Sequence, residues 1–136
     1  MSKTQSIIDW FAECGLVEDI IEFDVNQLAA KDDAAGLYKQ PAVTREKLID
    51  GSEIVTENYY LLFRRAAQLK ADRISNDDFL EQVEDWLVEQ EFAENYPDIG
   101  YPVYEVSISN SFYMLERDTN EAIYQLSISI KYERRR

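Results

Sequence analysis

The last thirty residues of the chain restrict its fold more than any other segment. Apolar and polar side chains alternate over residues 103–114 and again over residues 124–132. Alternation with a period of two over this length indicates two half-buried strands that form a hairpin. The apolar side chains share one face only in a register with three facing pairs: Phe112 with Leu126, Met114 with Tyr124, and Ile108 with Ile130.

This register also determines the loop of the hairpin. The three pairs centre on Thr119, so we expect an odd number of loop residues, most simply Asp118-Thr119-Asn120. A two-residue turn of Thr119 and Asn120 would slip the register by one residue and set Ser111 against Ile128. On the opposite face the register predicts two pairs of small polar residues: Ser111 with Ser127, and Ser109 with Ser129. Such a hairpin favours the building of a surface over catalysis.

The length of 136 residues predicts a single domain that spans residues 1–136, with residues 133–136 as a flexible basic tail. Hydrophobic residues make up 46%, which excludes a disordered chain. No apolar run approaches the length of about 18 residues that a membrane span needs, and the N-terminus lacks the pattern of a secretory signal. The one cysteine, Cys14, cannot form an internal disulfide. We expect it to be a packing or surface residue in a reducing cytoplasm.

The net charge of −13 and the absence of histidine argue against several functional classes. Lys and Arg number 14 against 27 Asp and Glu, which argues against binding of phosphate or nucleic acid. Without histidine, neither a His/Cys metal site nor a Ser-His-Asp or Cys-His nucleophile can form. A carboxylate pair could still perform acid–base chemistry, but the chain has no P-loop, GxGxxG or EF-hand pattern. We therefore expect no enzyme, and no catalytic, cofactor-binding or metal-binding residues.

Two segments have the spacing of amphipathic helices. The first covers residues 3–14, with an apolar stripe formed by Ile7, Ile8, Phe11 and Cys14. Trp10 lies off this stripe, so we expect it to reach a second contact. The second covers residues 75–93, with Ser75 or Asn76 as the cap and Phe79, Val83, Trp86 and Leu87 facing the core. Its acidic residues predict a solvated face: Glu81, Glu84, Asp85, Glu89 and Glu91.

The remaining apolar segments predict further strands. Residues 20–25 and 37–40 read as short strands, the latter at a sheet edge because Pro41 follows. Asp50-Gly51 predicts a hairpin between residues 43–49 and 54–65. Residues 59–63 are apolar on both faces, which indicates a central strand covered on one side by a helix and on the other by a helix or a neighbouring subunit. The order predicts an α+β fold: a mostly antiparallel sheet of about 4–6 strands with helices on one face.

The order of these segments resembles the tail terminator family of bacteriophages, also called minor capsid or tail-completion proteins of Gram-positive phages, prophages and phage-tail-like particles. The resemblance runs from about Ser6 to Tyr132, and Asp50-Gly51-Ser52 followed by residues 58–65 is its sharpest part. The matching pieces are the opening helix and residues 20–25, 47–52, 58–65, 76–87, 101–103 and 124–132.

The resemblance implies a homohexameric ring that caps the tail tube, stops its polymerisation and provides the surface for head or neck attachment. The implied partners are further copies of the chain, the tail tube protein and the head–tail connector. The implied place is the tail or neck of the virion, assembled in the bacterial cytoplasm. DNA would pass through such a ring without sequence-specific contacts, and no membrane is involved. Contractile and non-contractile tails both fit.

A closed ring needs two different patches on each subunit. At this net charge, self-association requires carboxylates to lie near Arg or Lys, so we expect assembly to depend on salt. The candidate interface residues are Arg64, Arg65, Arg73, Arg134, Arg135 and Arg136. Each one alone is equally consistent with an ordinary surface arginine. The nine tyrosines fit either an interface or plain strand positions.

Three other functions are compatible with parts of the sequence. An acidic DNA mimic of phage origin would fit the charge but needs carboxylates spaced like phosphates on one face. A small enzyme would need a pocket that holds a carboxyl group of raised pKa. An adaptor domain in a larger assembly overlaps with the ring-forming role.

Overall fold

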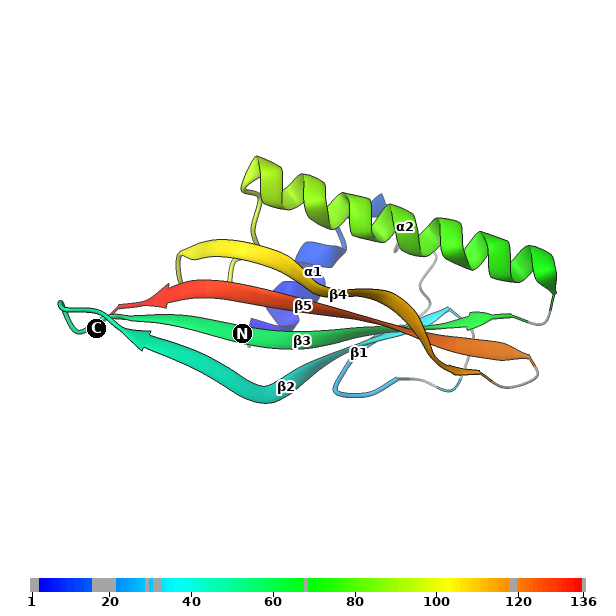
Figure 1. The fold of residues 1–136 in the computed structure, drawn as a ribbon, viewed down its shortest axis with the longest axis horizontal. Coiled ribbons are helices and arrows are strands. Elements are labelled where there is room, and N and C mark those ends of the chain that lie inside the picture. The colour runs from blue at the N-terminus through cyan, green and yellow to red at the C-terminus, as the bar shows by residue number, and fades with distance from the viewer. Residues whose placement is uncertain are drawn as a thin grey trace.

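A computed structural model describes residues 3–15, 22–28, 30, 33–67, 69–117 and 120–135. In chain order the elements are α1 (Lys3–Phe11), β1 (Glu22–Val25), β2 (Ala34–Lys47), β3 (Glu53–Ala66), α2 (Lys70–Ala93), β4 (Val103–Arg117) and β5 (Glu121–Arg134). The described strands form one sheet in the order β1-β2-β3-β5-β4 (Figure 1), and every pair is antiparallel except β1 with β2. The predicted α+β fold with a mostly antiparallel sheet and a long terminal hairpin is confirmed.

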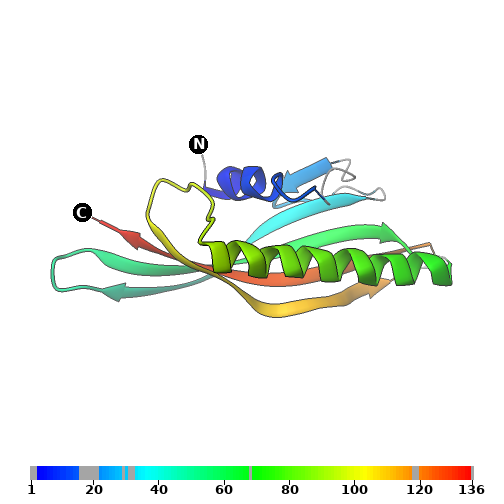
Figure 2. The same ribbon diagram turned by 90° about the horizontal axis from the view of Figure 1, so that it is seen from above.

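Both helices cover the same face of the sheet, as predicted (Figure 2). Helix α1 contacts β1 and β2, whereas α2 contacts β3 and β4. The two helices meet where the rings of Trp10 and Trp86 lie 4.9 Å apart. Under α2, the ring of Phe63 meets Phe79 edge-on at 5.2 Å. Alternate residues of the two central strands complete this core: Val55, Tyr59, Leu61, Phe63, Tyr124, Leu126, Ile128, Ile130 and Tyr132.

Helix α1 uses its predicted stripe but ends at Phe11, three residues before the predicted end. Turn hydrogen bonds continue past that residue, with the Cys14 N–H donating to the Phe11 carbonyl at 2.9 Å. Cys14 is buried. The prediction of a second contact for Trp10 is confirmed, because its indole Nε1 donates to the Asn95 carbonyl at 3.0 Å.

Helix α2 begins five residues earlier than predicted, at Lys70. The backbone N–H of Leu69 donates to the Asp72 carboxylate at 3.1 Å, which satisfies one of the unpaired donors at the helix start. The predicted caps Ser75 and Asn76 are therefore wrong, since both lie inside the helix. Asn76 is buried, and its amide donates to the Ala66 carbonyl at 2.8 Å.

The strand predicted at residues 37–40 is part of a longer strand. Strand β2 runs through Pro41 to Lys47, with a bulge between Lys39 and Val43. Strand β1 pairs with β2 only as far as Leu37, so no strand among the described residues needs the N–H that Pro41 lacks on that side. The hairpin predicted at Asp50-Gly51 is confirmed.

In that turn, Gly51 has a φ of 90°, which favours glycine, and Asp50 accepts hydrogen bonds from the N–H and the hydroxyl of Ser52.

The register of the terminal hairpin was predicted correctly at one end only. Met114 faces Tyr124, as predicted, but Ile108 faces Ile128 instead of Ile130. Four register shifts along β4 each add one residue relative to β5, and two of them lie between Ile108 and Tyr113. No facing pair of Phe112 with Leu126 is formed among the described pairs.

The predicted serine pairs are replaced by Ser107 with Ser129 and Asn110 with Ser127. Strand β4 ends at Arg117 and β5 begins at Glu121, so three residues connect them. Asp118 and Thr119 of the predicted loop lie outside the described residues.

The end of β5 differs from the predicted flexible tail. The strand continues through Arg134, and the buried Glu133 donates its backbone N–H to the Pro102 carbonyl at 2.9 Å. Residues 133 and 134 therefore belong to the sheet. Arg136 lies outside the described residues.

Candidate interaction surfaces

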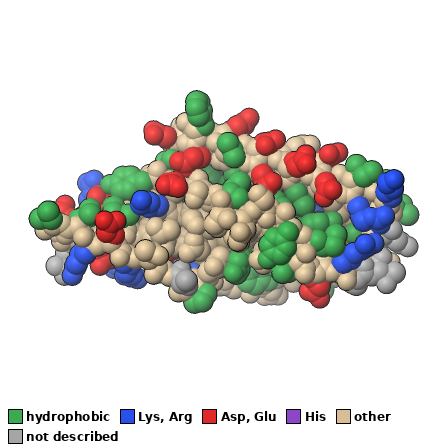
Figure 3. All heavy atoms as spheres, in the orientation of Figure 1, with side chains coloured by type: hydrophobic (Ala, Val, Ile, Leu, Met, Phe, Trp, Pro, Cys, Tyr) green, Lys and Arg blue, Asp and Glu red, His purple; other side chains and the backbone are tan. Residues whose placement is uncertain are grey.

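The sheet face opposite the helices, here called the open face, is not covered by either described helix. The register places three residues of neighbouring strands side by side on this face: Tyr38, Tyr60 and Ser127. The next row across the strands consists of Leu62, Gln125 and Tyr113. The Gln125 amide donates to the Tyr113 hydroxyl at 2.7 Å. Much of this face is neither apolar nor charged, and apolar side chains gather towards one end (Figure 3). The open face thus offers a broad surface with half-buried aromatic groups.

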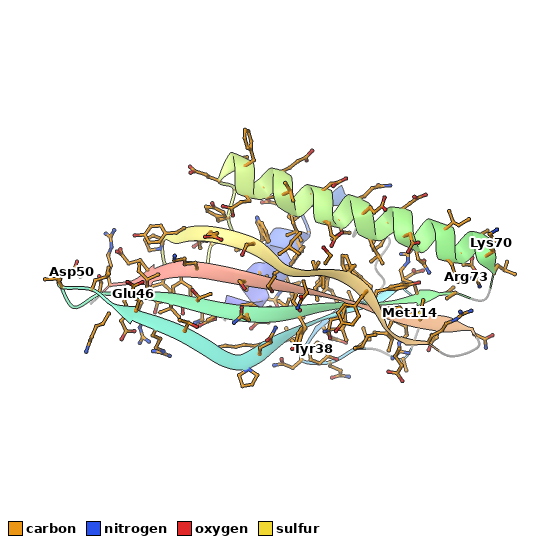
Figure 4. All side chains as sticks on the ribbon, viewed as in Figure 1. Tyr38, Glu46, Asp50, Lys70, Arg73 and Met114 are labelled. Atoms are coloured by element: carbon orange, nitrogen blue, oxygen red, sulfur yellow. The ribbon has the colours of Figure 1, made fainter. Side chains whose placement is uncertain are left out.

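The β2–β3 hairpin projects beyond both helices and forms a second surface, here called the arm (residues 44–56; Figure 1). Ile49 lies in its turn and is fully exposed. Arg45 and Lys47 pair with Val55 and Glu53, so they share the side of the arm that continues the helix-covered face. Asp50 and Glu46 lie at this end of the molecule in Figure 4.

The arm is basic next to its turn. Four cations and one carboxylate, with a glycine, line a hollow of about 420 Å³: Arg45, Lys47, Arg134, Arg135, Glu53 and Gly51. Arg45 pairs with Glu53 at 3.6 Å, and Arg135 pairs with Glu133. The arm residues Arg45, Lys47 and Ile49 are not among the interface residues expected from the sequence. Their signal was present, since the apolar pair Leu48-Ile49 lies beside Asp50-Gly51 after two alternating cations.

A groove of about 410 Å³ lies between α2 and β4. Apolar groups and two carboxylates line it: Leu87, Val88, Glu91, Tyr104, Glu105, Val106, Ser107 and Ile108. Val88 is 60% exposed and Tyr104 is 47% exposed, so this apolar surface is accessible to a partner. The groove runs beside β4, which is an edge strand of the sheet.

Two carboxylates of α2 occupy backbone donors of this edge strand. Glu91 accepts a hydrogen bond from the Val106 N–H at 2.6 Å, and Glu84 accepts one from the Phe112 N–H at 2.9 Å. The prediction that Glu84 and Glu91 are solvated is therefore wrong, because each is half-buried against β4. Glu81, Asp85 and Glu89 are exposed, as predicted, and acidic groups follow the outer side of α2 in Figure 3.

The predicted interface arginines lie at two opposite ends of the molecule. Arg64, Arg65 and Arg73 lie near the start of α2, and Figure 4 marks Arg73 at the end opposite the arm. Arg134 and Arg135 lie at the arm. Arg136 lies outside the described residues. The five candidates within the described residues therefore do not form a single patch.

The first three arginines make contacts within the chain. Arg64 pairs with Glu121 at 2.7 Å, and Arg73 donates to the Ala67 carbonyl at 3.2 Å. Arg65 donates to the Asn76 amide oxygen at 2.9 Å, and its guanidinium lies 4.2 Å from the centre of the Phe79 ring. The contacts of Arg65 and Arg73 hold the start of α2 on the end of the sheet, whereas the Arg64–Glu121 pair joins β3 to β5.

Glu57 is a buried carboxylate in the middle of β3. It accepts hydrogen bonds from Lys3 at 2.5 Å, from Tyr59 at 2.7 Å and from Tyr132 at 2.7 Å. Burial alone would raise its pKa, but these three donors outweigh burial and lower the pKa of Glu57 to about 2. Burial and the bond to Glu57 raise the pKa of Tyr59. Glu57 thus stays ionised near neutral pH, unlike the carboxyl of raised pKa that the enzyme alternative requires.

Among the described residues, no group of three or more His, Cys, Asp or Glu side chains is placed to hold a metal ion. Neither α1 nor α2 combines the length and apolarity of a membrane-spanning helix. A scan against protein-family models found no match to this chain, and a search of curated proteins found no relative.

Proposed function

We propose that this chain is a tail terminator of a phage or a phage-tail-like particle. It would form a ring on the last ring of the tail tube, stop further polymerisation and present the attachment surface for the head or neck. The resemblance in segment order motivates the proposal. This role needs surfaces that fit other proteins and needs no reactive group.

The observation that carries the proposal is the open face. One face of the sheet packs under α1 and α2, while the other has the half-buried Tyr38, Tyr60 and Leu62 beside the exposed Tyr113. Tyr has a large apolar area with a polar tip, a combination that is frequent at protein interfaces. A sheet with two unlike faces, together with a projecting arm, gives each subunit the different patches that a head-to-tail ring requires.

The charge also suits a ring through which DNA moves. At a net charge of −13, the chain has few cations to neutralise phosphates, and an acidic row follows the outer side of α2 (Figure 3). Nonspecific affinity for DNA depends on cations that release counterions from the phosphates. A ring of this composition would therefore let DNA pass without holding it.

The decisive experiment removes the protein from particles that contain it. In a strain that produces the particle but lacks this gene, we expect tails of abnormal and variable length without heads, because nothing stops tube growth. Negative-stain electron microscopy measures the lengths, and the wild-type gene supplied in trans is the control. Tails of normal length with heads attached would refute the proposal.

The assembly state offers a faster measurement. Six chains of 15.9 kDa give a ring of roughly 95 kDa, which native mass spectrometry resolves from the monomer. Because the interfaces would pair carboxylates with Arg or Lys, the ring should weaken as salt increases.

The acidic row on α2 favours one alternative, an acidic DNA mimic of phage origin. Asp78, Glu81, Asp85 and Glu89 are exposed on successive turns of the helix. A mimic would bind a DNA-binding host protein in competition with DNA. Its loss would leave tail length unchanged, so the deletion experiment separates the two functions.

A further inference from the structure

We infer that the arm of one copy docks in the groove between α2 and β4 of a second copy. The inference rests on the proposed function, since it identifies the contact that would join neighbouring subunits of the ring. It assigns the apolar turn residue Ile49 to the groove and the arm cations to the carboxylates around it.

The groove is lined mainly by apolar side chains and has carboxylates at its borders. Leu87, Val106 and Ile108 line it, and Glu91 and Glu105 are the charged residues among its lining. On the helix beside the groove, the acidic residues of the outer row are exposed. A partner that fits this surface brings an apolar side chain flanked by positive charges.

The edge strand restricts how a partner can bind there. An exposed edge strand commonly accepts another strand through its free backbone groups. In this groove the Val106 N–H already donates to the Glu91 carboxylate at 2.6 Å. Farther along β4, the Phe112 N–H donates to the Glu84 carboxylate. Strand addition would have to break these charge-assisted bonds, so we expect the partner to bind through side chains.

The arm has the complementary chemistry. Ile49 is fully exposed in its turn, and Arg45 and Lys47 project from the strand that leads to it. Arg134, from the end of β5, faces Glu53 and adds a third cation to the same side of the arm. An apolar residue at the end of an arm with a row of cations is complementary to an apolar groove with acidic borders.

The arm cannot reach the groove of its own chain. Val106 faces Ile130, and Ile130 faces Glu57, so the groove lies level with Glu57 along the sheet. Glu53, at the start of β3, lies four residues before Glu57, which is about 13 Å from it at the usual rise of a strand. Ile49 lies beyond Glu53, still farther from the groove. The hairpin also projects away from α2 (Figure 1). The contact therefore joins two copies.

Arm and groove are different surfaces, so each copy inserts its arm into one neighbour and accepts the arm of another neighbour in its groove. Such a contact is heterologous, and its repetition closes a ring when the rotation between copies allows it. This is the geometry that the proposed terminator requires.

Cysteine cross-linking tests the contact directly. The variants Ile49→Cys and Val88→Cys are purified separately, mixed and oxidised mildly, and the disulfide-linked dimer is followed on a non-reducing gel. Both positions are exposed, so neither variant should fail to fold, and the native Cys14 is buried. Thiols held together in the complex should react on the order of tenfold faster than unbound ones, because of their effective concentration.

The matched control replaces Val88→Cys with Ile74→Cys, a position on α2 that is 55% exposed. It lies 14 residues from Val88, about 21 Å along the helix. Equal rates for the two mixtures would overturn the inference, as would a wild-type chain that stays monomeric at high concentration.

A charge exchange gives a second test. Arg45→Glu with Lys47→Glu in the arm, or Glu105→Lys at the groove, should each weaken assembly of the variant alone. Mixing the two variants should restore mixed oligomers, because each reversed arm then meets a reversed groove. Failure of the mixture to assemble while each variant folds would count against the contact.

The outcomes distinguish this inference from the proposed function. If the wild-type ring forms and tail length depends on the chain but the cross-link stays at the control rate, only the arm–groove contact is wrong. If the cross-link forms but deletion leaves tails normal, the contact stands and the tail terminator role fails.

Discussion

The ammonium group of Lys3 lies 2.5 Å from a carboxylate oxygen of Glu57, and this contact ties the first turn of α1 to the middle of β3. The same ammonium donates to the Tyr132 hydroxyl at 2.9 Å. Because Tyr59 and Tyr132 also donate to Glu57, the carboxylate is satisfied without water. The cluster therefore orients α1 on the sheet.

The Glu57 cluster predicts a dependence of stability on pH. The pKa of Glu57 is lowered from 4.5 to about 2 in the folded chain, so its contribution is complete above the unfolded pKa and is lost as pH falls towards 2. We expect Glu57→Gln to cost about 1–3 kcal/mol at neutral pH. Between pH 4.5 and 2 its stability should fall less steeply than that of the wild type. Urea denaturation across this range measures both effects.

Glu46→Gln is the control for that experiment, because Glu46 is an exposed carboxylate on the neighbouring strand. Its stability curve should follow the wild type. Identical curves for Glu57→Gln and the wild type would show that the cluster contributes nothing.

Gly36 is required by close packing. A Cβ at this position would lie 2.4 Å from the Gln27 carbonyl oxygen and 3.0 Å from a ring carbon of Tyr38. The chain after β1 would have to move, so Gly36→Ala should destabilise by about 1–3 kcal/mol. Gly15→Ala is the control, since nothing lies within 4 Å of its added Cβ. Thermal unfolding of the two variants should differ by several degrees, and equal melting temperatures would contradict the packing described.

Leu61 and Leu62 are adjacent and face opposite sides of the sheet. Leu61 is fully buried under the helices, whereas Leu62 is half-buried on the open face. Leu61→Ala should cost about 2–5 kcal/mol of folding stability. Leu62→Ala should cost less in the monomer and should weaken any assembly that covers the open face. Denaturation and sedimentation of both variants test this, and equal effects on both quantities would show that the open face is not used.

The carboxylate of Glu91 should protect the edge of the sheet. Glu91→Ala leaves the Val106 N–H without its acceptor, at a cost of about 1–3 kcal/mol, and exposes a donor to strands of other molecules. We expect increased light scattering on storage. Glu89→Ala is the control, because it removes an exposed carboxylate two residues away. Equal scattering from both variants would mean that the carboxylate at position 91 does not protect β4.

The sequence predicted those parts of the fold that depend on side-chain alternation and turn chemistry. The terminal hairpin, the Asp50-Gly51 turn and the inner faces of both helices follow from periodicity and local geometry. The start of α2 did not, because Asn76 looks like a cap by sequence yet serves as a buried partner of Arg65. Nothing local distinguishes the two roles.

The bulges of β4 could not be predicted either, because alternation assumes one residue opposite one residue. The same holds for the roles of Glu84 and Glu91. On a helical wheel they belong to the acidic side, and only the position of β4 beside α2 gives them backbone donors to accept. The charge of an arginine and its position in the sequence carry no information on its partners within the chain.

Outward N–H and C=O groups alternate along the edge of a strand. The positions of Glu84 and Glu91 on α2 must therefore match the positions of outward N–H groups on β4. Phe112 lies six positions after Val106, and two bulges lie between Ile108 and Tyr113. Loss of a single residue from this stretch would turn a carbonyl oxygen towards one of the two glutamates, and attraction would become repulsion. Insertions or deletions that this part of β4 tolerates should therefore contain an even number of residues.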